Sequence, residues 1–356
     1  MRRLRIAVLL GVTVIGTAVC EDFAAKRFGN NPLVSVDSSK SLGDNINGPS
    51  VIRVPDWVHH PLGRYYLYFA HHKGSYIRLA YANSLSGPWR VYEPGVLQGR
   101  DTAFWRPGPD PPGRLDLYTH VASPDVFIDE PHKRLVMWVH GMWTDGRAWP
   151  PDASTARQWL RDNGYGQYTQ TAVSEDGVHF QVQPRITAKV SYLRAFLWKG
   201  QLYGMGRLGV LARAEDVLGR FEVGPSAFSS ASYSDRVRHV ALLVRGDTLY
   251  VFFSGIGDSP ERIMLSTVAL RGDWRTWRAS TPKEVIAPRE KYECVDRSVE
   301  PSKPGESEGP ERALRDPAIY EEGGKVLLFY SVCGEQGIGA ADVTSFFSLE
   351  GPGTAK

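Results

Sequence analysis

Short runs of β-branched and aromatic residues recur along the chain, separated by turns rich in Gly, Pro and Asp. The clearest example spans 315–332, where two apolar runs flank the dipeptide Gly323-Gly324. Runs of this length with turns of this kind are typical of antiparallel hairpins. The pattern predicts strands over most of the chain, and only the stretch 152–163 has the composition of a helix.

The same order of three runs occurs five times, and the first run of each unit begins near residues 47, 123, 191, 237 and 315. Several units then continue through a Gly- or Asp-containing turn and an aromatic residue into a fourth, outer strand. The irregular spacing indicates a degenerate repeat with insertions. Repeated four-stranded units that bury both faces are typical of β-propellers. We therefore predict an all-β fold, a five-bladed β-propeller of four-stranded antiparallel blades.

The N-terminus has the features of a secretory signal over residues 1–20, with a basic start, a short apolar core and small residues before a cleavage point after Cys20. The apolar run is shorter than the roughly 20 residues that a membrane span requires. Attachment as a lipoprotein through Cys20 is less favoured, because Thr17-Ala18-Val19 matches that motif poorly. We expect a secreted or periplasmic protein with an irregular lead-in at 21–45, the propeller at 46–345 and a tail at 346–356.

The amino-acid composition limits the kinds of partner that we expect the protein to bind. The net charge is +3, with 42 basic and 39 acidic residues mixed along the chain, so no basic face for nucleic acid is expected. No membrane association is expected after signal removal, no cofactor or metal is indicated, and the oligomeric state is left open. Cys294 and Cys333 remain after cleavage, and they either form a disulfide that ties the 273–313 insertion to the last repeat or stay as separate thiols.

The first strand of each propeller blade lines the central channel, so the residues that open these strands converge at one end of the axis. Carboxylates, a histidine and arginines occupy these positions, and further polar residues follow the second strands. The strand starts carry Asp125, Tyr192, Arg194, Arg238, His239, Arg315 and Asp316, and the turns carry His71, His72, Lys73 and Glu335.

Several blade motifs resemble a known group of enzymes. The motifs are the segments 48–52, 65–70 and 77–82, with Gly87-Pro88-Trp89, Ser123-Pro124-Asp125-Val126 and Arg315-Asp316-Pro317-Ala318. Together they resemble the five-bladed propeller glycosidases of families 43, 62, 32, 68 and 117 over nearly all of residues 45–345. The resemblance implies cleavage of glycosidic bonds by carboxylates on inner strands, one donating a proton to the leaving oxygen and one activating water or attacking the sugar.

The chain departs from this family at the first blade, where the usual Asp before Pro is replaced by Gly48. The usual later Glu also has no counterpart near Tyr192 or His239. The remaining candidates for catalysis are Asp125 and Asp316, with His239 as an acid, as a histidine is thought to act in family 117. The candidates for substrate binding are Arg194, Arg238, Arg315, His71, His72, Lys73, Tyr192 and Glu335. Two arginines on inner strands suit an anionic group on a carbohydrate.

Each candidate also has a structural alternative. Asp125 can stabilise a turn through local hydrogen bonds, and Asp316 can form an ion pair with Arg315. His239 can be a buried channel histidine with satisfied hydrogen bonds. We therefore expect a glycoside hydrolase that acts on a polysaccharide or oligosaccharide, and the alternative is a non-catalytic carbohydrate-binding propeller.

Overall fold

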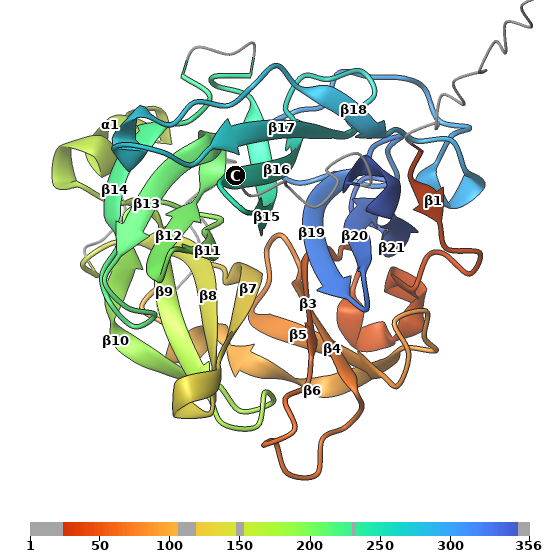
Figure 1. Cartoon of the computed structure of the whole chain (residues 1–356), viewed down its shortest axis with the longest axis horizontal. Helices are drawn as coiled ribbons and strands as arrows, with labels where there is room; N and C mark the ends of the chain where they lie inside the picture. The colour runs from red at the N-terminus through yellow and green to blue at the C-terminus, as the bar shows by residue number, and fades with distance from the viewer. Residues whose placement is uncertain (1–23, 106–118, 147–152, 230–232, 348–356) are drawn as a thin grey trace, which may run out of the picture.

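A computed structural model describes residues 24–105, 119–146, 153–229 and 233–347. These residues form five antiparallel sheets around a central axis (Figure 1). The prediction of an all-β, five-bladed propeller is confirmed. The signal predicted at residues 1–20 lies outside the described part of the chain.

The strands of blades one to four run in sequence order from the axis to the rim. Blade one comprises β3 (Asn47–Arg53), β4 (Tyr65–Ala70), β5 (Tyr76–Ala82) and β6 (Arg90–Gln98). Blade two comprises β7 (Ala122–Asp129), β8 (Arg134–Trp143), β9 (Gly166–Ser174) and β10 (Gln181–Ala188). Blade three comprises β11 (Arg194–Trp198), β12 (Gln201–Met205), β13 (Val210–Ala214) and β14 (Glu222–Ser226). Blade four comprises β15 (Val237–Arg245), β16 (Thr248–Gly255), β17 (Ile263–Ala269) and β18 (Lys283–Ile286).

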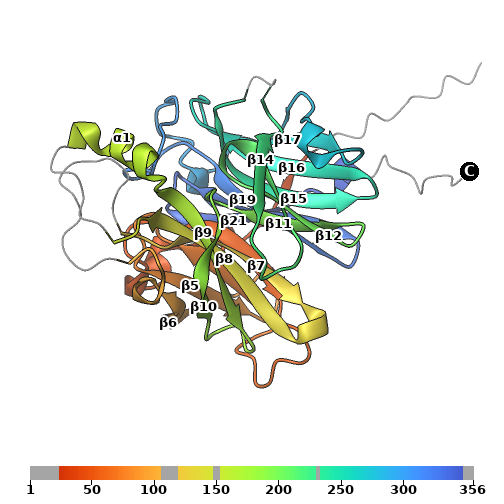
Figure 2. The same cartoon turned by 90° about the vertical axis from the view of Figure 1, so that its left-hand side faces the viewer.

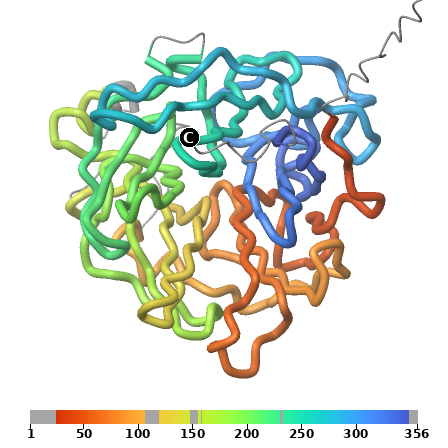
Figure 3. Tube along the Cα trace, viewed as in Figure 1, coloured from red at the N-terminus to blue at the C-terminus, as the bar shows by residue number. Residues whose placement is uncertain are grey.

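Blade five is completed by the N-terminal segment. It contains β19 (Arg315–Glu322), β20 (Lys325–Val332) and β21 (Gly337–Asp342), and both β1 (Lys26–Arg27) and β2 (Val34–Ser35) pair with β21. Figure 3 shows the two ends of the described chain side by side in this blade. The segment 21–45 was expected to be irregular, but part of it supplies the outer edge of a sheet because β21 offers unpaired backbone groups there.

The core lies between neighbouring blades rather than in one place. In β4, Tyr66 and Tyr68 pack toward blade two, whereas Leu67 and Phe69 pack toward blade five. Alternate side chains of a strand point to opposite faces, so a strand with both faces covered is apolar at every position. Each such fully buried side chain contributes roughly 1.5–3 kcal/mol of transfer free energy. The continuous apolar runs of the sequence therefore encode the stacking of blades.

The helix predicted at 152–163 is present as α1 (Ala153–Asn163), and Asp152 lies outside the described residues. It projects at one end of the propeller (Figure 2), where Ala156 packs against Met142 of β8. No described helix has the length and apolar character needed to cross a membrane. Short 3-10 helices are η1 (Val36–Ser38), η2 (Lys40–Leu42), η3 (Gly99–Asp101), η4 (Glu130–His132), η5 (Arg207–Gly209), η6 (Trp274–Thr276), η7 (Lys291–Glu293) and η8 (Thr344–Phe347).

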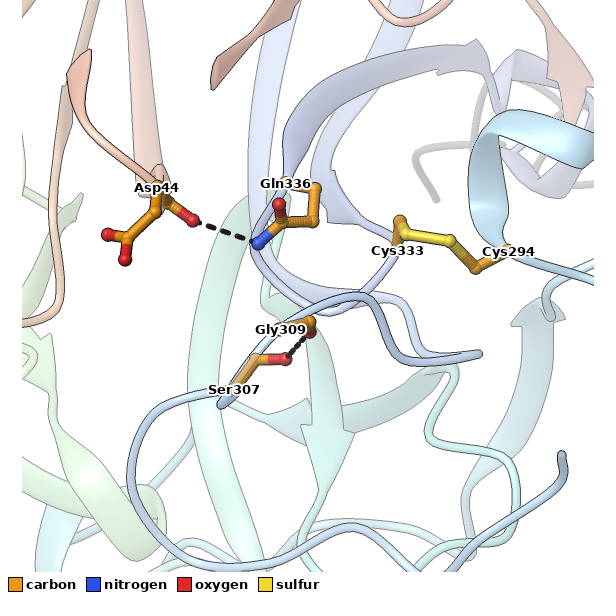
Figure 4. The surroundings of a disulfide bond; sticks show 6 residues. All are labelled: Asp44, Cys294, Ser307, Gly309, Cys333 and Gln336. Atoms are coloured by element: carbon orange, nitrogen blue, oxygen red, sulfur yellow. Dashed lines mark hydrogen bonds between the residues drawn. A yellow bond between two sulfur atoms is a disulfide. The ribbon is translucent and has the colours of Figure 1, made fainter. Parts of the chain in front are cut away.

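Cys294 and Cys333 form a disulfide, with their Cα atoms 4.9 Å apart (Figure 4). Of the two alternatives left open by the sequence, the paired one is found. The bond ties the long segment after β18 to the turn between β20 and β21. In the same turn, Gln336 Nε2 donates a hydrogen bond of 2.9 Å to the carbonyl oxygen of Asp44. The disulfide therefore fixes the insertion beside the end of the channel where the inner strands begin.

Replacing Cys294 by Ser should lower the free energy of unfolding by about 2–4 kcal/mol, because the unfolded chain regains the freedom that the crosslink removes. Urea unfolding followed by tryptophan fluorescence measures the change. Wild-type protein treated with dithiothreitol is the matched control and should unfold at the same urea concentration as the variant. Equal midpoints for the variant and the oxidised wild type would contradict a stabilising role.

Candidate functional site

A common backbone feature opens three of the inner strands. Gly48, Ser123 and Asp316 have positive φ angles of 60°, 47° and 50°, and each is followed by a proline in the sequence. The pairing to the second strand shifts register at these points in blades one, two and five. Bulges of this kind re-aim a side chain. The three residues are therefore equivalent positions, and Ser123, not Asp125, is the counterpart of Asp316 in blade two.

Side chains from blades two, four and five meet at this end of the axis. Asp316 Oδ1 contacts Nδ1 of His239, and Asp316 Oδ2 accepts a hydrogen bond of 3.1 Å from Ser331 Oγ. On the other side of the ring, His239 Nε2 lies 3.4 Å from Ser123 Oγ. Ser123 and His239 are 4% exposed and Asp316 is fully buried. A carboxylate beside Nδ1 favours the tautomer with its proton there, so Nε2 faces Ser123 as an acceptor.

A row of aromatic rings continues from His239. The ring of Tyr192 lies 3.9 Å from that of His239 and 4.0 Å from that of His140, measured between centroids. Burial, and then the charge of Arg194, lowers the pKa of His239 well below its ordinary value. Burial and the nearby His120 lower the pKa of His140 in the same way. Both imidazoles are therefore neutral near pH 7.

A buried ion-pair network joins blades four and five. Glu261 is fully buried, and its carboxylate lies 2.8 Å from Arg238 Nε and 2.9 Å from Arg315 Nε. Arg315 also donates to Glu311 at 2.6 Å and lies 3.6 Å from Glu335. Burial raises the pKa of Glu261, but the two guanidinium groups outweigh it and leave the pKa below its ordinary value. The network carries ionised groups that hold two inner strands together.

Glu335 extends the network toward blade one. Its carboxylate accepts a hydrogen bond from Asn45 Nδ2 and lies 3.5 Å from His72 Nδ1. Burial would raise the pKa of Glu335, but His72 and Arg315 outweigh this effect and hold it well below the ordinary value. Glu335 is therefore an ionised carboxylate in a buried position.

The neighbouring turn residues lie further out. His71 Nε2 is 3.0 Å from Asp44 Oδ1, and Lys73 forms an ion pair with Glu306. Burial lowers the pKa of His71, with the hydrogen bond to Asp44 acting against it. These two side chains form the outer edge of the site.

Asp125 has a different setting, inside the channel. It accepts hydrogen bonds from Arg194 Nη1 at 3.1 Å and from the backbone N–H of Ala195 at 2.9 Å. Arg194 also donates to the carbonyl oxygens of Pro124 at 2.7 Å and Pro49 at 3.0 Å. The pair lines a cavity of about 170 Å³ bordered by all five inner strands. Asp125 and Arg194 thus connect the inner strands of blades one to three.

The structure therefore divides the predicted site residues into four groups. His239, Asp316 and Tyr192 meet at the axis, while Arg238, Arg315, Glu335 and His72 form the ion-pair network. Asp125 and Arg194 lie in the channel, and His71 and Lys73 lie at the outer edge. The guanidinium groups of Arg194, Arg238 and Arg315 bind protein acceptors, and their direct contact with a substrate stays a prediction.

Two important residues were missed from the sequence. Ser123 stood in the Ser-Pro-Asp motif, and aligning the prolines after Gly48, Ser123 and Asp316 would have found it. Glu261 follows β16 in a loop without a repeated motif, so no local signal marked it. Among the described residues, no group of three or more His, Cys, Asp or Glu is arranged to hold a metal ion.

Gly48, which stands where the resemblance implies an Asp, has no room for a side chain. A Cβ atom at this position would lie 2.9 Å from Cα and 3.0 Å from Oγ of Ser123. Real Cβ atoms do not approach backbone atoms so closely. Any side chain at position 48, Asp included, would therefore displace Ser123.

Gly48→Ala should destabilise the protein more than Gly246→Ala, because Gly246 has a φ of 53° but a Cβ atom there would meet nothing within 4 Å. Both variants carry left-handed backbone strain of about 1–2 kcal/mol. Only Gly48→Ala adds steric overlap with Ser123, which costs about 1–3 kcal/mol more. Urea unfolding of the two variants compares them, and equal losses would show that the contact with Ser123 is loose.

Glu261→Gln should lower the free energy of unfolding by about 3–5 kcal/mol, since it leaves Arg238 and Arg315 buried without their carboxylate. The exposed pair of Glu222 and Arg275 provides the control, and Glu222→Gln should leave the unfolding midpoint unchanged. Thermal and urea unfolding test both variants. A Glu261→Gln protein as stable as the control would refute a structural role for the network.

Comparison with known proteins sets this site in context. The chain matches no protein-family model. By structure it is similar to an α-L-arabinofuranosidase from Lactobacillus brevis, with 13% identity, coverage of 88% of this chain and 92% of the other, and a TM-score of 0.52. It is also similar to a GH43 β-xylosidase/α-arabinofuranosidase from a compost microbial metagenome, with 12% identity, coverage of 90% and 95%, and a TM-score of 0.56. These similarities confirm the predicted resemblance at the level of the five-bladed fold.

One sequence relative is much nearer. The chain is 32% identical over 338 residues to "Uncharacterized protein R118" of Acanthamoeba polyphaga mimivirus, and the match covers 88% of this chain and 89% of the viral protein. Identity at this level over most of both chains shows common family membership. The chain belongs to the same family as this uncharacterized mimivirus protein.

Proposed function

We propose that the protein is a carbohydrate-active hydrolase that cleaves glycosidic bonds at the end of the channel where the inner strands begin. The observation that carries the proposal is the contact between Asp316 and Nδ1 of His239, which leaves Nε2 facing Ser123. The fold supports the substrate class, because the structural neighbours with this fold include enzymes named for arabinosides and xylosides.

Glycosidic cleavage needs a proton donor for the leaving oxygen and a base for water. We assign the donor to His239 in its protonated form, with Asp316 as a positioning residue that stabilises the imidazolium. We assign the base to Glu335, whose pKa lies well below its ordinary value because of His72 and Arg315. Tyr192 is half-buried beside His239 and offers an aromatic surface for a sugar ring.

A non-catalytic carbohydrate-binding propeller is the second candidate. It is favoured by the partners of the acidic groups, because Asp125, Glu261 and Glu335 all face cationic side chains of the protein. Gly48 also stands where the resemblance implies a catalytic Asp. Secretion and recognition of an anionic sugar belong to the same proposal, and both require direct measurement.

Sugar release from a panel of neutral, uronate-bearing and sulfated glycans tests the proposal across pH. The donor role requires protonated His239, and burial lowers its pKa below 6.5, so release should increase as the pH falls below 6.5 while the protein stays folded. His239→Gln should reduce release about 10²–10⁴-fold. Asp316→Asn should move the profile to lower pH, because the imidazolium loses its carboxylate.

His179→Gln is the matched control, because His179 forms an exposed pair with Asp176. This variant should release sugar at the wild-type rate. If the wild type releases no sugar at any pH but is retarded in a glycan affinity gel, the binding function replaces the hydrolase. Equal handling of neutral and charged glycans would remove the anionic part of the proposal.

A further inference from the structure

The hydroxyl group of Ser123 has no role in the proposed glycosidase chemistry, yet it occupies a position of chemical interest. Its Oγ atom lies 3.4 Å from Nε2 of His239, and the opposite nitrogen of the same ring contacts Asp316. Ser331 donates to the second oxygen of Asp316 at 3.1 Å, which fixes the carboxylate. A hydroxyl, an imidazole and a carboxylate in this order can activate the hydroxyl as a nucleophile.

The backbone holds Ser123 rigidly in place. Its φ of 47° belongs to the left-handed region, which a residue with a side chain adopts only when its surroundings require it. Arg194 donates to the carbonyl oxygens of Pro124 at 2.7 Å and Pro49 at 3.0 Å, and so joins the bulges of blades one and two. Gly48 lets the first bulge pass directly beside the Ser123 hydroxyl.

The protonation states of the acidic and basic groups in the site also favour an ester over a glycoside as the substrate. Both Glu261 and Glu335 are ionised, and Asp125 lies against Arg194, so none of the three offers a proton to a leaving group. A glycosidic bond needs a proton donor, a role that His239 fills only when it is protonated, whereas an ester can be cleaved by a nucleophile and a base. A neutral His239 supplies that base.

We propose that Ser123, His239 and Asp316 form a serine-hydrolase triad that cleaves acyl esters, and that the preferred substrates are acyl groups on sugar hydroxyls. Ser123 is the nucleophile, His239 is the base and Asp316 is the positioning residue. Only the sugar part of this inference rests on the proposed function, because ester cleavage by the triad does not require a carbohydrate.

The steps balance with water as the only co-reactant. Ser123 Oγ attacks the carbonyl carbon while His239 Nε2 takes the hydroxyl proton. The bond from the carbonyl carbon to the alcohol oxygen then breaks, and His239 returns the proton to the leaving oxygen. Water adds to the acyl group in the same way, giving a carboxylic acid and regenerating Ser123. We assign stabilisation of the developing oxyanion to the side-chain amide of Asn47, which precedes Gly48 and whose Nδ2 lies 3.4 Å from Nδ1 of His72.

Ester and glycoside cleavage should depend on pH in opposite ways. The base role requires neutral His239, so ester cleavage should be constant near pH 7 and should fall only at a pH well below 6.5. Asp316, Ser123 and Tyr192 contact the ring. The charges of Arg194, Arg238, His140 and His72 also act on it, and all four oppose its protonation.

The test is to treat the purified protein with a small fluorophosphonate and to measure its intact mass and labelled peptides. We expect one adduct on Ser123. In parallel, hydrolysis of 4-nitrophenyl acetate should fall about 10³-fold or more in Ser123→Ala. Ser266→Ala is the control, because Ser266 is also buried but lies in β17, where it donates to the carbonyl oxygen of Ser280. Asp316→Asn should move the acid limb of the ester profile to lower pH, which a merely structural role would not do.

Melting curves show which variants fold. If Ser123→Ala does not fold, the adduct on the wild-type protein decides whether Ser123 is the nucleophile. No adduct on Ser123 in folded wild type, or full esterase activity in folded Ser123→Ala, would overturn the inference. An acetylated oligosaccharide that loses acetate without chain cleavage supports the triad while the glycosidase proposal fails. Sugar release that persists in Ser123→Ala, by a protein without any esterase activity, supports the glycosidase proposal while the triad fails.

Discussion

The carboxylate of Glu261 lies between Arg238 and Arg315, and the geometry of the site depends on this contact. Removing such charges from water is costly, and only close pairing offsets the cost. Each arginine is followed directly in sequence by a residue of the site, His239 in blade four and Asp316 in blade five. The ion pairs therefore set the separation of the two strands, and with it the contact between imidazole and carboxylate. Stability and chemistry are coupled here through neighbouring residues.

Most of the fold could be predicted from the sequence because a blade buries both faces. The six residues from Tyr65 to Ala70 are all buried, and a strand of this kind is continuously apolar in sequence. The predicted strand starts near 47, 123, 191, 237 and 315 lie within three residues of the observed ones. The exception was the lead-in, where two-residue strands are too short to produce a period.

The site was harder to predict because bulges and loops decide which side chains meet. A register shift selects Ser123 rather than Asp125 to face His239, and only the alignment of prolines hints at it. Glu261 comes from a loop whose path depends on the packed blades. The rarity of buried arginine drew attention to Arg194 and Arg238, but that rarity holds equally for arginines in structural ion pairs.

The N-terminal strands that complete blade five also affect how the ring is assembled. Lys26 pairs with Asp342, so the first described strand can pair only after the last one has formed. Contacts this distant in sequence form slowly, because the chain must first lose the entropy of a very large loop. During synthesis four blades can stack before the ring closes, and the open faces of blades one and four remain in contact with water until then. Pairing of β1 with β21 then completes blade five between blades four and one, and this step closes the ring around the channel.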